Sequence, residues 1–295
     1  MGRRAPPALR IHEYLAQRSD VELLRIDPDK RKDPAERARL LNAADVAFLC
    51  LPDAAAREAA AMVTNPNTCL IDASTAHRID PSWAFGLPEL SRGQRGQTAP
   101  EQANRQSGLP RQRLHPAGAP AGGRRHRAGG AAAYQAGGDD KLLSPRPYGL
   151  TLAHKHIPEM MTHTGLTTKP VFLPIVGNFY KGLAVSLPLH FEQLAPGTDA
   201  QRLQAALEAH YEGERFVKVM PLRDAATLEA GFFDVQATND TNDVELFVFA
   251  HDTQAVLIAR LDNLGKGASG AGRAVHERAP GPGRSPRLVM EHPVP

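Results

Sequence analysis

The chain has 295 residues, of which 42% are hydrophobic, and this is enough to bury the core of one large or two ordinary domains. It has no apolar run long enough to cross a bilayer, and its N-terminal residues are basic without an apolar stretch. We therefore expect a cytoplasmic protein with neither a membrane span nor a secretory signal. The net charge is +3 (35 basic minus 32 acidic residues), and the charged residues are distributed very unevenly along the chain.

The first region, from Ile11 to Leu90, alternates predicted helices and strands. The expected helices cover 11–17, 33–41 and 52–63, and the expected strands cover 21–26, 46–51 and 69–73. Asp33-Pro34 is a typical helix start, and 46–51 is a continuous apolar run of the kind buried in parallel sheets. Strands separated by helices predict βαβ units, and hence a Rossmann-type α/β domain with a doubly wound parallel sheet over residues 1–147.

Both cysteines, Cys50 and Cys69, fall in apolar, strand-like runs. Two cysteines in such positions are typical of buried, reduced thiols rather than of a disulfide framework or a metal site. We therefore expect no metal.

The stretch 91–133 is rich in Arg, Gly and Pro, and its eight arginines and single acid, Glu101, give it a net charge of +7. It contains no Val, Ile, Met, Phe, Trp or Tyr, so it offers neither a patterned face nor a surface on which bases can stack. We expect this stretch to be disordered, with no nucleic-acid and no membrane partner. A basic nucleic-acid-binding module is one alternative, and it predicts DNA affinity that falls steeply with salt.

The second region predicts a different kind of domain. Its expected strands cover 171–176, 183–189, 216–220, 244–249 and 255–261. The expected helix, 199–211, has Leu203, Leu207 and Tyr211 on one amphipathic face, which is typical of packing on a sheet. We expect an α+β substrate and dimerisation domain with a largely antiparallel sheet over 148–263. The C-terminal segment 264–295 is expected to start as a helix and end as a disordered tail.

The segment Asp72-Ala73-Ser74-Thr75-Ala76-His77-Arg78 follows an expected strand. Ligands of doubly wound sheets bind beyond the carboxyl ends of the strands, so we expect Ser74, and Pro52 after the preceding strand, to contact a cofactor. A plain strand-to-turn junction is the alternative.

The segment Leu152-Ala153-His154-Lys155-His156-Ile157-Pro158-Glu159-Met160 contains two histidines at i and i+2. On an extended segment the two rings point to opposite faces, so they do not chelate one metal, and one of them faces a catalytic cleft as a general base. A pair of surface histidines is the alternative.

The segment from Leu261 to Gly270 places small residues at an expected helix start. Small residues there let backbone amides approach an anion, which makes Asn263 and Gly267 candidate cofactor contacts. A glycine-rich turn of this kind is weak evidence by itself.

These segments, together with Gly86-Leu87-Pro88-Glu89-Leu90 and Val176-Gly177-Asn178-Phe179-Tyr180-Lys181-Gly182, closely resemble the N-acetyl-gamma-glutamyl-phosphate reductases in their shorter form. The resemblance covers about residues 9–90 and 134–271. It implies a homo-oligomeric, cytoplasmic enzyme of arginine biosynthesis that uses NADPH to convert an acyl phosphate to N-acetylglutamate 5-semialdehyde. In the family mechanism a cysteine thiolate attacks the acyl phosphate, phosphate leaves, and hydride reduces the thioester.

Site residues follow from the resemblance and from position. His156 is our first choice for the general base and His154 the second, and Lys181 is expected to meet a substrate anion as a point charge. Lys30, Arg31 and Lys32 are candidates for the 2′-phosphate that distinguishes NADP, with a solvated basic turn as the alternative.

The chain differs from the family in the two segments that bind the cofactor and supply the nucleophile. The family opens with a strand and a loop ending in Gly-Thr-Thr-Gly-Leu, where this chain has Arg-Ala-Pro-Pro-Ala-Leu at 4–9. The family nucleophile lies in an Asn-Pro-Gly-Cys segment beyond Pro-Glu-Leu, but residues 91–133 contain no cysteine. Neither Cys50 nor Cys69 matches that position.

A change of reading frame accounts for these departures. With permitted codons, residues 108–115 read one base later give Gly-Cys-His-Ala-Ser-Gly-Phe, and residues 4–9 read two bases later contain Gly-Thr-Thr-Gly. Skipping one base in 271–277 gives Ala-Ala-Val-Gln-Tyr-Met, which resembles the closing helix of the family. We hypothesise that residues 1–8, about 91–131 and 272–295 are frameshifted. The alternatives are a catalytically inactive homologue that only oligomerises and, more distantly, a semialdehyde dehydrogenase acting on aspartyl phosphate.

Overall fold

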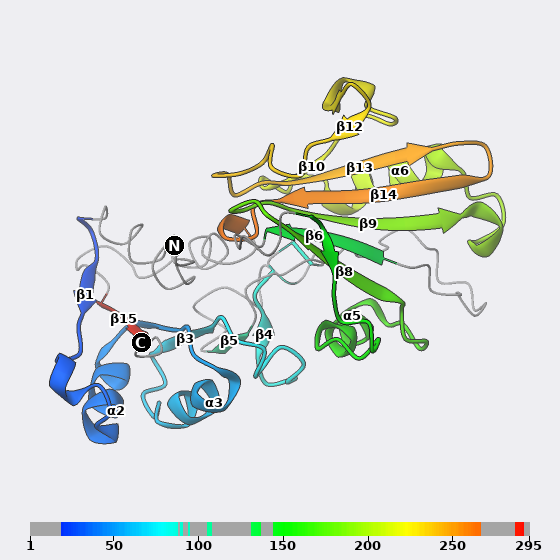
Figure 1. The fold of residues 1–295 in the computed structure, drawn as a ribbon. Coiled ribbons are helices and arrows are strands. Elements are labelled where there is room, and N and C mark those ends of the chain that lie inside the picture. The colour runs from blue at the N-terminus through cyan, green and yellow to red at the C-terminus, as the bar shows by residue number, and fades with distance from the viewer. Residues whose placement is uncertain are drawn as a thin grey trace. The chain divides into compact units, whose positions relative to one another are not determined.

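The computed structural model describes residues 19–87, 89–90, 94, 105–107, 131–136, 144–266 and 287–291 (Figure 1). Contacts divide the chain into two units, with boundaries between Arg111 and Gln112 and between Gly267 and Ala268. The helix expected at 11–17 lies outside the described residues.

The first unit is built on a parallel sheet with the strand order β1-β15-β2-β3-β5-β4, in which every pairing is parallel. The strands are β1 (Glu22–Leu24), β15 (Arg287–Glu291), β2 (Val46–Leu49), β3 (Cys69–Asp72), β5 (Arg105–Ser107) and β4 (Ala84–Phe85). The helices α2 (Pro34–Ala43) and α3 (Asp53–Ala61) precede β2 and β3. The predicted parallel sheet of an α/β domain and the expected elements between residues 21 and 73 are confirmed.

Local chemistry sets the limits of these helices. The Asp33 side chain accepts a hydrogen bond from Ala35 N at 2.9 Å, with Pro34 in the first turn. At the other end, Asn42 ties the two helices together: its Oδ1 accepts from Asn65 N at 2.7 Å and its Nδ2 donates to Met62 O at 2.9 Å. The buried face of α3 consists of alanines, so this helix packs closely on the sheet.

Strand β15 lies between β1 and β2, in the C-terminal segment for which the sequence predicted a disordered tail. Leu288 is fully buried, and Arg287 N donates to the Asp45 carboxylate at 2.7 Å. The prediction of disorder was wrong for Arg287–Glu291, because Leu288, Val289 and Met290 supply the apolar run of a central strand.

The second unit is a seven-stranded sheet with the order β10-β13-β14-β9-β6-β8-β7. Its strands are β6 (Ala131–Ala136), β7 (Arg146–Pro147), β8 (Phe172–Gly177), β9 (Leu183–His190), β10 (Val217–Val219), β13 (Val244–Ala250) and β14 (Gln254–Leu261), and a separate hairpin joins β11 (Leu228–Glu229) to β12 (Phe232–Phe233). Four of the six pairings in the large sheet are antiparallel, which confirms the predicted α+β domain.

Helices α5 (His156–Thr164) and α6 (Ala200–Tyr211) complete the second unit. The predicted amphipathic face of α6 is confirmed, since Leu203 and Leu207 are buried in one cluster with Leu246, Val248 and Leu257 of the sheet. This face therefore packs on the sheet and stabilises it.

The division between the units differs from the expected boundary at residue 147, because β6 and β7 pair within the second sheet. The stretch 91–133, expected to be disordered, contains β5 and the first residues of β6. The segment Ala131–Ala136 gives no periodic apolar signal in the sequence.

Among the helices that the structure describes, none combines the length and the apolar character needed to cross a bilayer.

Candidate active site

The carboxyl end of β3 carries a buried polar network. Asp72 is fully buried, and its two oxygens accept hydrogen bonds from Ser74 N and Ser74 Oγ, each at 2.8 Å. His77 Nδ1 lies 2.8 Å from Asp72 Oδ2. The turn after the strand is thus organised around one carboxylate, as buried polar groups require partners.

His77 also stacks on Trp83, with ring centroids 3.9 Å apart and an interplanar angle of 11°. Arg78 is buried beside them and donates from Nε to Ser74 O at 2.7 Å. The motif that follows Asp72 is therefore a rigid, internally bonded turn.

Pro52 lies at the start of α3, directly after the neighbouring strand β2. Because β2 and β3 are adjacent and parallel, Pro52 and Ser74 lie at the same edge of the sheet. The Asp53 carboxylate joins the two turns by accepting from Thr75 N at 3.0 Å. The structure therefore places both of these sequence-predicted residues at one edge of the sheet.

His154 and His156 lie at the start of α5, with ring centroids 4.8 Å apart. The prediction of an extended segment with the two rings on opposite faces was wrong, because His156 is the first residue of the helix. Pro158 lies in the first turn, where a missing amide hydrogen is tolerated, and this was the signal for a helix start. His156 Nδ1 lies 3.1 Å from Oε1 of the buried Glu159.

The His154 ring lies among other rings and close to a tight turn. Its centroid is 5.2 Å from that of Phe172 and 5.7 Å from that of Tyr148. Gly149 makes the turn with a φ of 66°, and a Cβ there would lie 3.4 Å from the His154 ring. Partial burial, followed by the charges of His156 and Lys155, lowers the pKa of His154. The His154 ring is therefore harder to protonate than an imidazole in water.

A second polar cluster surrounds the loop before β9. Lys181 pairs with the Asp240 carboxylate, and Gly182 N donates to Asn263 Oδ1 at 2.8 Å. Asp262 is fully buried and accepts from Leu264 N at 2.8 Å and Gly265 N at 2.9 Å. The turn that the sequence analysis proposed for a cofactor is thus organised by Asp262, while Asn263 Oδ1 holds the start of β9. Gly267 lies outside the described residues.

Neither thiol is activated. Burial, with a smaller contribution from the Asp72 charge, raises the pKa of Cys50 to about 12, and burial raises the pKa of Cys69 to about 11. Both cysteines are free thiols in the structure; Cys69 is buried, as predicted, whereas Cys50 is half-buried. Within the described residues, no group of three His, Cys, Asp or Glu side chains is arranged to hold a metal.

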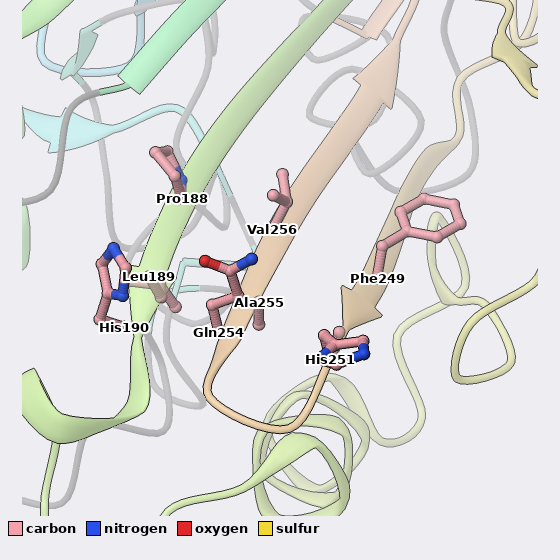
Figure 2. Close-up of a pocket in the computed structure, with 9 residues that line it drawn as sticks. Pro188, Leu189, His190, Phe249, His251, Gln254, Ala255 and Val256 are labelled. Atoms are coloured by element: carbon pink, nitrogen blue, oxygen red, sulfur yellow. The ribbon is translucent and has the colours of Figure 1, made fainter.

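A pocket of about 380 Å³ lies where β9 ends and β13 turns into β14, and Figure 2 shows the residues that line it. His190, His251 and Gln254 lie around it. None of the sequence-predicted site residues lines this pocket.

Sequence reasoning did not assign roles to Asp72, His77, Glu159 or Asp262. The sequence feature that could have indicated the acidic residues is a carboxylate at the end of an apolar strand or in the first turn of a helix. At such positions a carboxylate accepts hydrogen bonds from backbone amides or from an imidazole. For Asp72 this signal was present, since it ends β3 in a fully buried position.

Comparison with known proteins supports the same division. Residues 15–97 match the family described as semialdehyde dehydrogenase, NAD binding domain, and residues 128–263 match the semialdehyde dehydrogenase dimerisation domain. An aspartate semialdehyde dehydrogenase from Francisella tularensis has a similar fold, with a TM-score of 0.60 at 13% identity over 91% of this chain and 94% of that chain.

Curated relatives are closer in sequence. N-acetyl-gamma-glutamyl-phosphate reductase 2 of Pseudomonas putida is 41% identical over 92% of both chains. The protein of that name from a Nostoc species is 40% identical over 92% of both chains, and the N-acetyl-gamma-glutamyl-phosphate reductase of Burkholderia cenocepacia is 41% identical over the same shares. With this identity across most of its length, the chain belongs to the N-acetyl-gamma-glutamyl-phosphate reductase family.

Proposed function

We propose that the protein reduces N-acetyl-gamma-glutamyl phosphate to N-acetylglutamate 5-semialdehyde with NADPH and releases phosphate, as a homo-oligomeric, cytoplasmic enzyme of arginine biosynthesis. The observation that carries the proposal is the 41% identity to reductases of that name over 92% of the chain. The match of residues 128–263 to a dimerisation domain supports the oligomer.

The first unit offers a suitable place for the dinucleotide. Pro52 and Ser74 both follow carboxyl ends of adjacent parallel strands, which is where doubly wound sheets bind nucleotides. The hydroxyl of Ser74 donates to Asp72 and accepts from Ala76 N at 3.0 Å, so its position is fixed before a ligand arrives. We propose these two residues as the cofactor contacts, and bound NADPH supplies the hydride.

The second unit supplies the groups for proton transfer and anion binding. His156, held by Glu159, is the proposed general base, and His154 beside it is the second choice. Lys181, which pairs with Asp240, is the proposed contact for a substrate anion.

The acyl-transfer step needs a thiolate, and neither cysteine provides one. A thiol with a pKa of about 12 or about 11 is almost entirely protonated at neutral pH. This absence is explained if residues 1–8, about 91–131 and 272–295 are read out of frame, and the ordinary reductase is then the product of the corrected gene.

The test is to resequence the coding DNA across codons 1–10, 88–135 and 268–295, and to assay both chains by the near-ultraviolet absorbance of NADPH. We expect single-base changes that restore Gly-Thr-Thr-Gly and Gly-Cys, with turnover by the corrected chain and turnover at least about 10³-fold slower by the printed chain. DNA that encodes the printed sequence, combined with no turnover, would establish the inactive, oligomerising homologue instead. Equal turnover by both chains would show that the missing cysteine is not needed.

A further inference from the structure

A buried arginine joins two strands of the second sheet to the segment that follows β12. Arg260 of β14 is 5% exposed and lies directly opposite Glu245 of β13. Its Nε and Nη2 donate to Oε2 of Glu245 at 2.9 and 2.6 Å, and its Nη1 donates to the backbone oxygen of Asp234 at 2.8 Å. One flat guanidinium thus binds a side chain of the sheet and the backbone of another segment, and a lysine, with a single nitrogen, is not equivalent to it.

Two aromatic rings fix the position of this guanidinium. Its Cζ lies 4.8 Å from the ring centroid of Phe233 and 5.0 Å from that of Phe247. The two rings meet edge to face, with centroids 5.1 Å apart. Because Phe233 directly precedes Asp234, Arg260 contacts this part of the chain both through a ring and through the backbone. The end of β12 is therefore anchored on the sheet.

The segment 234–240, which begins at this anchor, ends at the loop before β9. Within the segment, Asn239 N donates to Gln236 O at 2.9 Å. The Asn239 side chain then donates from Nδ2 to Lys181 O at 3.1 Å, and the Asp240 carboxylate pairs with the Lys181 ammonium. The segment therefore connects the buried arginine with both the backbone and the side chain of Lys181.

The far end of the segment is also closely packed. Asp240 N donates to Oδ2 of the buried Asp262 at 2.9 Å. Gly182 has a φ of 118°, and a Cβ there would lie only 2.8 Å from the backbone oxygen of Val235. Because no side chain fits between Gly182 and the segment, the loop before β9 and the segment 234–240 lie backbone against backbone. A displaced segment would leave this loop without its support.

We propose that Arg260 is a positioning residue, which anchors the segment 234–240 on the sheet and thereby holds Lys181 in place for the anionic group of the substrate. Arg260 acts through Asn239 and Asp240 and does not itself touch the substrate. A cation on a flexible side chain binds an anion more tightly when its position is fixed beforehand. The role of Lys181 rests on the proposed reductase function, whereas the anchoring of the segment does not.

The structural alternative is that Arg260 only pairs β13 with β14 through Glu245. Loss of the ion pair would then weaken the pairing of these two strands, and it would leave the segment 234–240 no more mobile than the strands. The two possibilities therefore differ in where the backbone is loosened.

The test combines Arg260→Met with Glu245→Leu, so that both members of the buried ion pair are replaced and no unpaired charge is left. Amide hydrogen exchange, followed by NMR of the full chain, is the first measurement. We expect exchange at Asp240 N to be at least about 10-fold faster, with the amides between β13 and β14 unchanged. Arg215→Met is the matched control and should alter neither, because this exposed arginine also lies over a ring, 5.1 Å from the Phe216 centroid.

The second measurement is the affinity for N-acetyl-L-glutamate, an unreactive analogue of the substrate, titrated into the same samples. We expect the double variant to bind it at least about 10-fold more weakly than the unaltered chain and the control. Arg260→Lys keeps a charge beside Glu245 but lacks the fork that also reaches Asp234 O, so it should show the same two effects. This variant serves for both measurements if the double variant does not fold.

Unchanged exchange at Asp240 N would overturn the proposal, and so would equal loosening of the segment and of the two strands. Unchanged affinity in a variant whose segment exchanges faster would overturn the link to Lys181. If the unaltered chain binds no N-acetyl-L-glutamate, the proposed substrate is wrong, and faster exchange at Asp240 N would still establish that Arg260 anchors the segment. Failure of the reductase proposal is thus distinct from failure of this one.

Discussion

Asp72 shows how one residue organises the turn that follows a strand. It has no exposed surface, and it accepts from Ser74 twice and holds His77, which stacks on Trp83. Because three contacts of this turn end on the same carboxylate, its loss leaves several buried polar groups without partners.

We expect Asp72→Ala to lower the free energy of unfolding of the first unit by about 3 kcal/mol, since removal of a buried, hydrogen-bonded charge leaves its partners unsatisfied. Urea unfolding followed by fluorescence of Trp83, the single tryptophan of the chain, measures the change. Asp29→Ala, at an exposed turn, is the control and should change stability by less than about 0.5 kcal/mol. A loss as small as that of the control would show that the network contributes little.

Cys50 and Cys69 should resist alkylation in the folded protein. Their pKa values are raised to about 12 and about 11, so at mildly alkaline pH the thiolate fraction is far below that of a free cysteine. We expect labelling by a thiol reagent to be at least about 10²-fold faster in denaturant than in native buffer. Fast labelling of either cysteine in native buffer would contradict the raised pKa values and would make that residue a candidate nucleophile.

At the scale of elements, strands with a continuous or alternating apolar pattern were predicted from the sequence, and strands without such a pattern were missed. The apolar runs that became β2, β3, β9 and β14 were found because buried strands need continuous or alternating apolar residues. β6 and β15 were missed, since they lie in Arg-, Gly- and Ala-rich surroundings whose composition resembles disorder. The start of α5 was predicted as extended, but it is helical, and Pro158 in its first turn is the local signal for a helix start.

The candidate site was predicted in part for the same reason. Position after a strand made Pro52 and Ser74 candidates, the paired histidines made His154 and His156 candidates, and Lys181 came from the segment that resembles the family; the roles of all five stay predictions. The groups that hold these residues, such as Glu159 and Asp262, come from packing between distant segments, and their burial is not visible in a local pattern.

Strand β15 should be essential for the first unit. Leu288 is fully buried between β1 and β2, so Leu288→Ala creates a cavity and should cost about 3 kcal/mol in the free energy of unfolding. Trp83 fluorescence during urea unfolding reports the loss. Ile79→Ala is the matched control, because this side chain is 51% exposed and its truncation should cost less than about 0.5 kcal/mol. Equal effects of the two substitutions would show that β15 is not a central strand in solution.

At the scale of the whole molecule, charge is the feature most open to misinterpretation. The net charge of +7 in residues 91–133 contrasts with a chain total of +3, so the remainder is acidic, with a net charge of −4 (+3 minus +7). A basic stretch without aromatic or patterned residues attracts phosphate groups only through screened Coulomb forces.

We expect no saturable DNA binding at physiological salt, as measured by fluorescence anisotropy of a labelled duplex. Any attraction seen at low salt should disappear when residues 91–133 are deleted, because no other segment of this length carries a comparable positive charge. Tight binding at physiological salt that is lost on this deletion would favour the nucleic-acid-binding alternative.

The position of β15 also constrains how the protein is made. A ribosome releases the chain from its N-terminus onward, and β1 and β2 emerge more than two hundred residues before the strand that lies between them, as the 242-residue separation of Arg287 and Asp45 shows. All described strands of the second sheet leave the ribosome before β15 does. The parallel sheet of the first unit can be completed only after nearly all of the chain has been synthesised. Until then, the edges of β1 and β2 that pair with β15 have unpaired backbone groups, and we expect a chaperone to bind them.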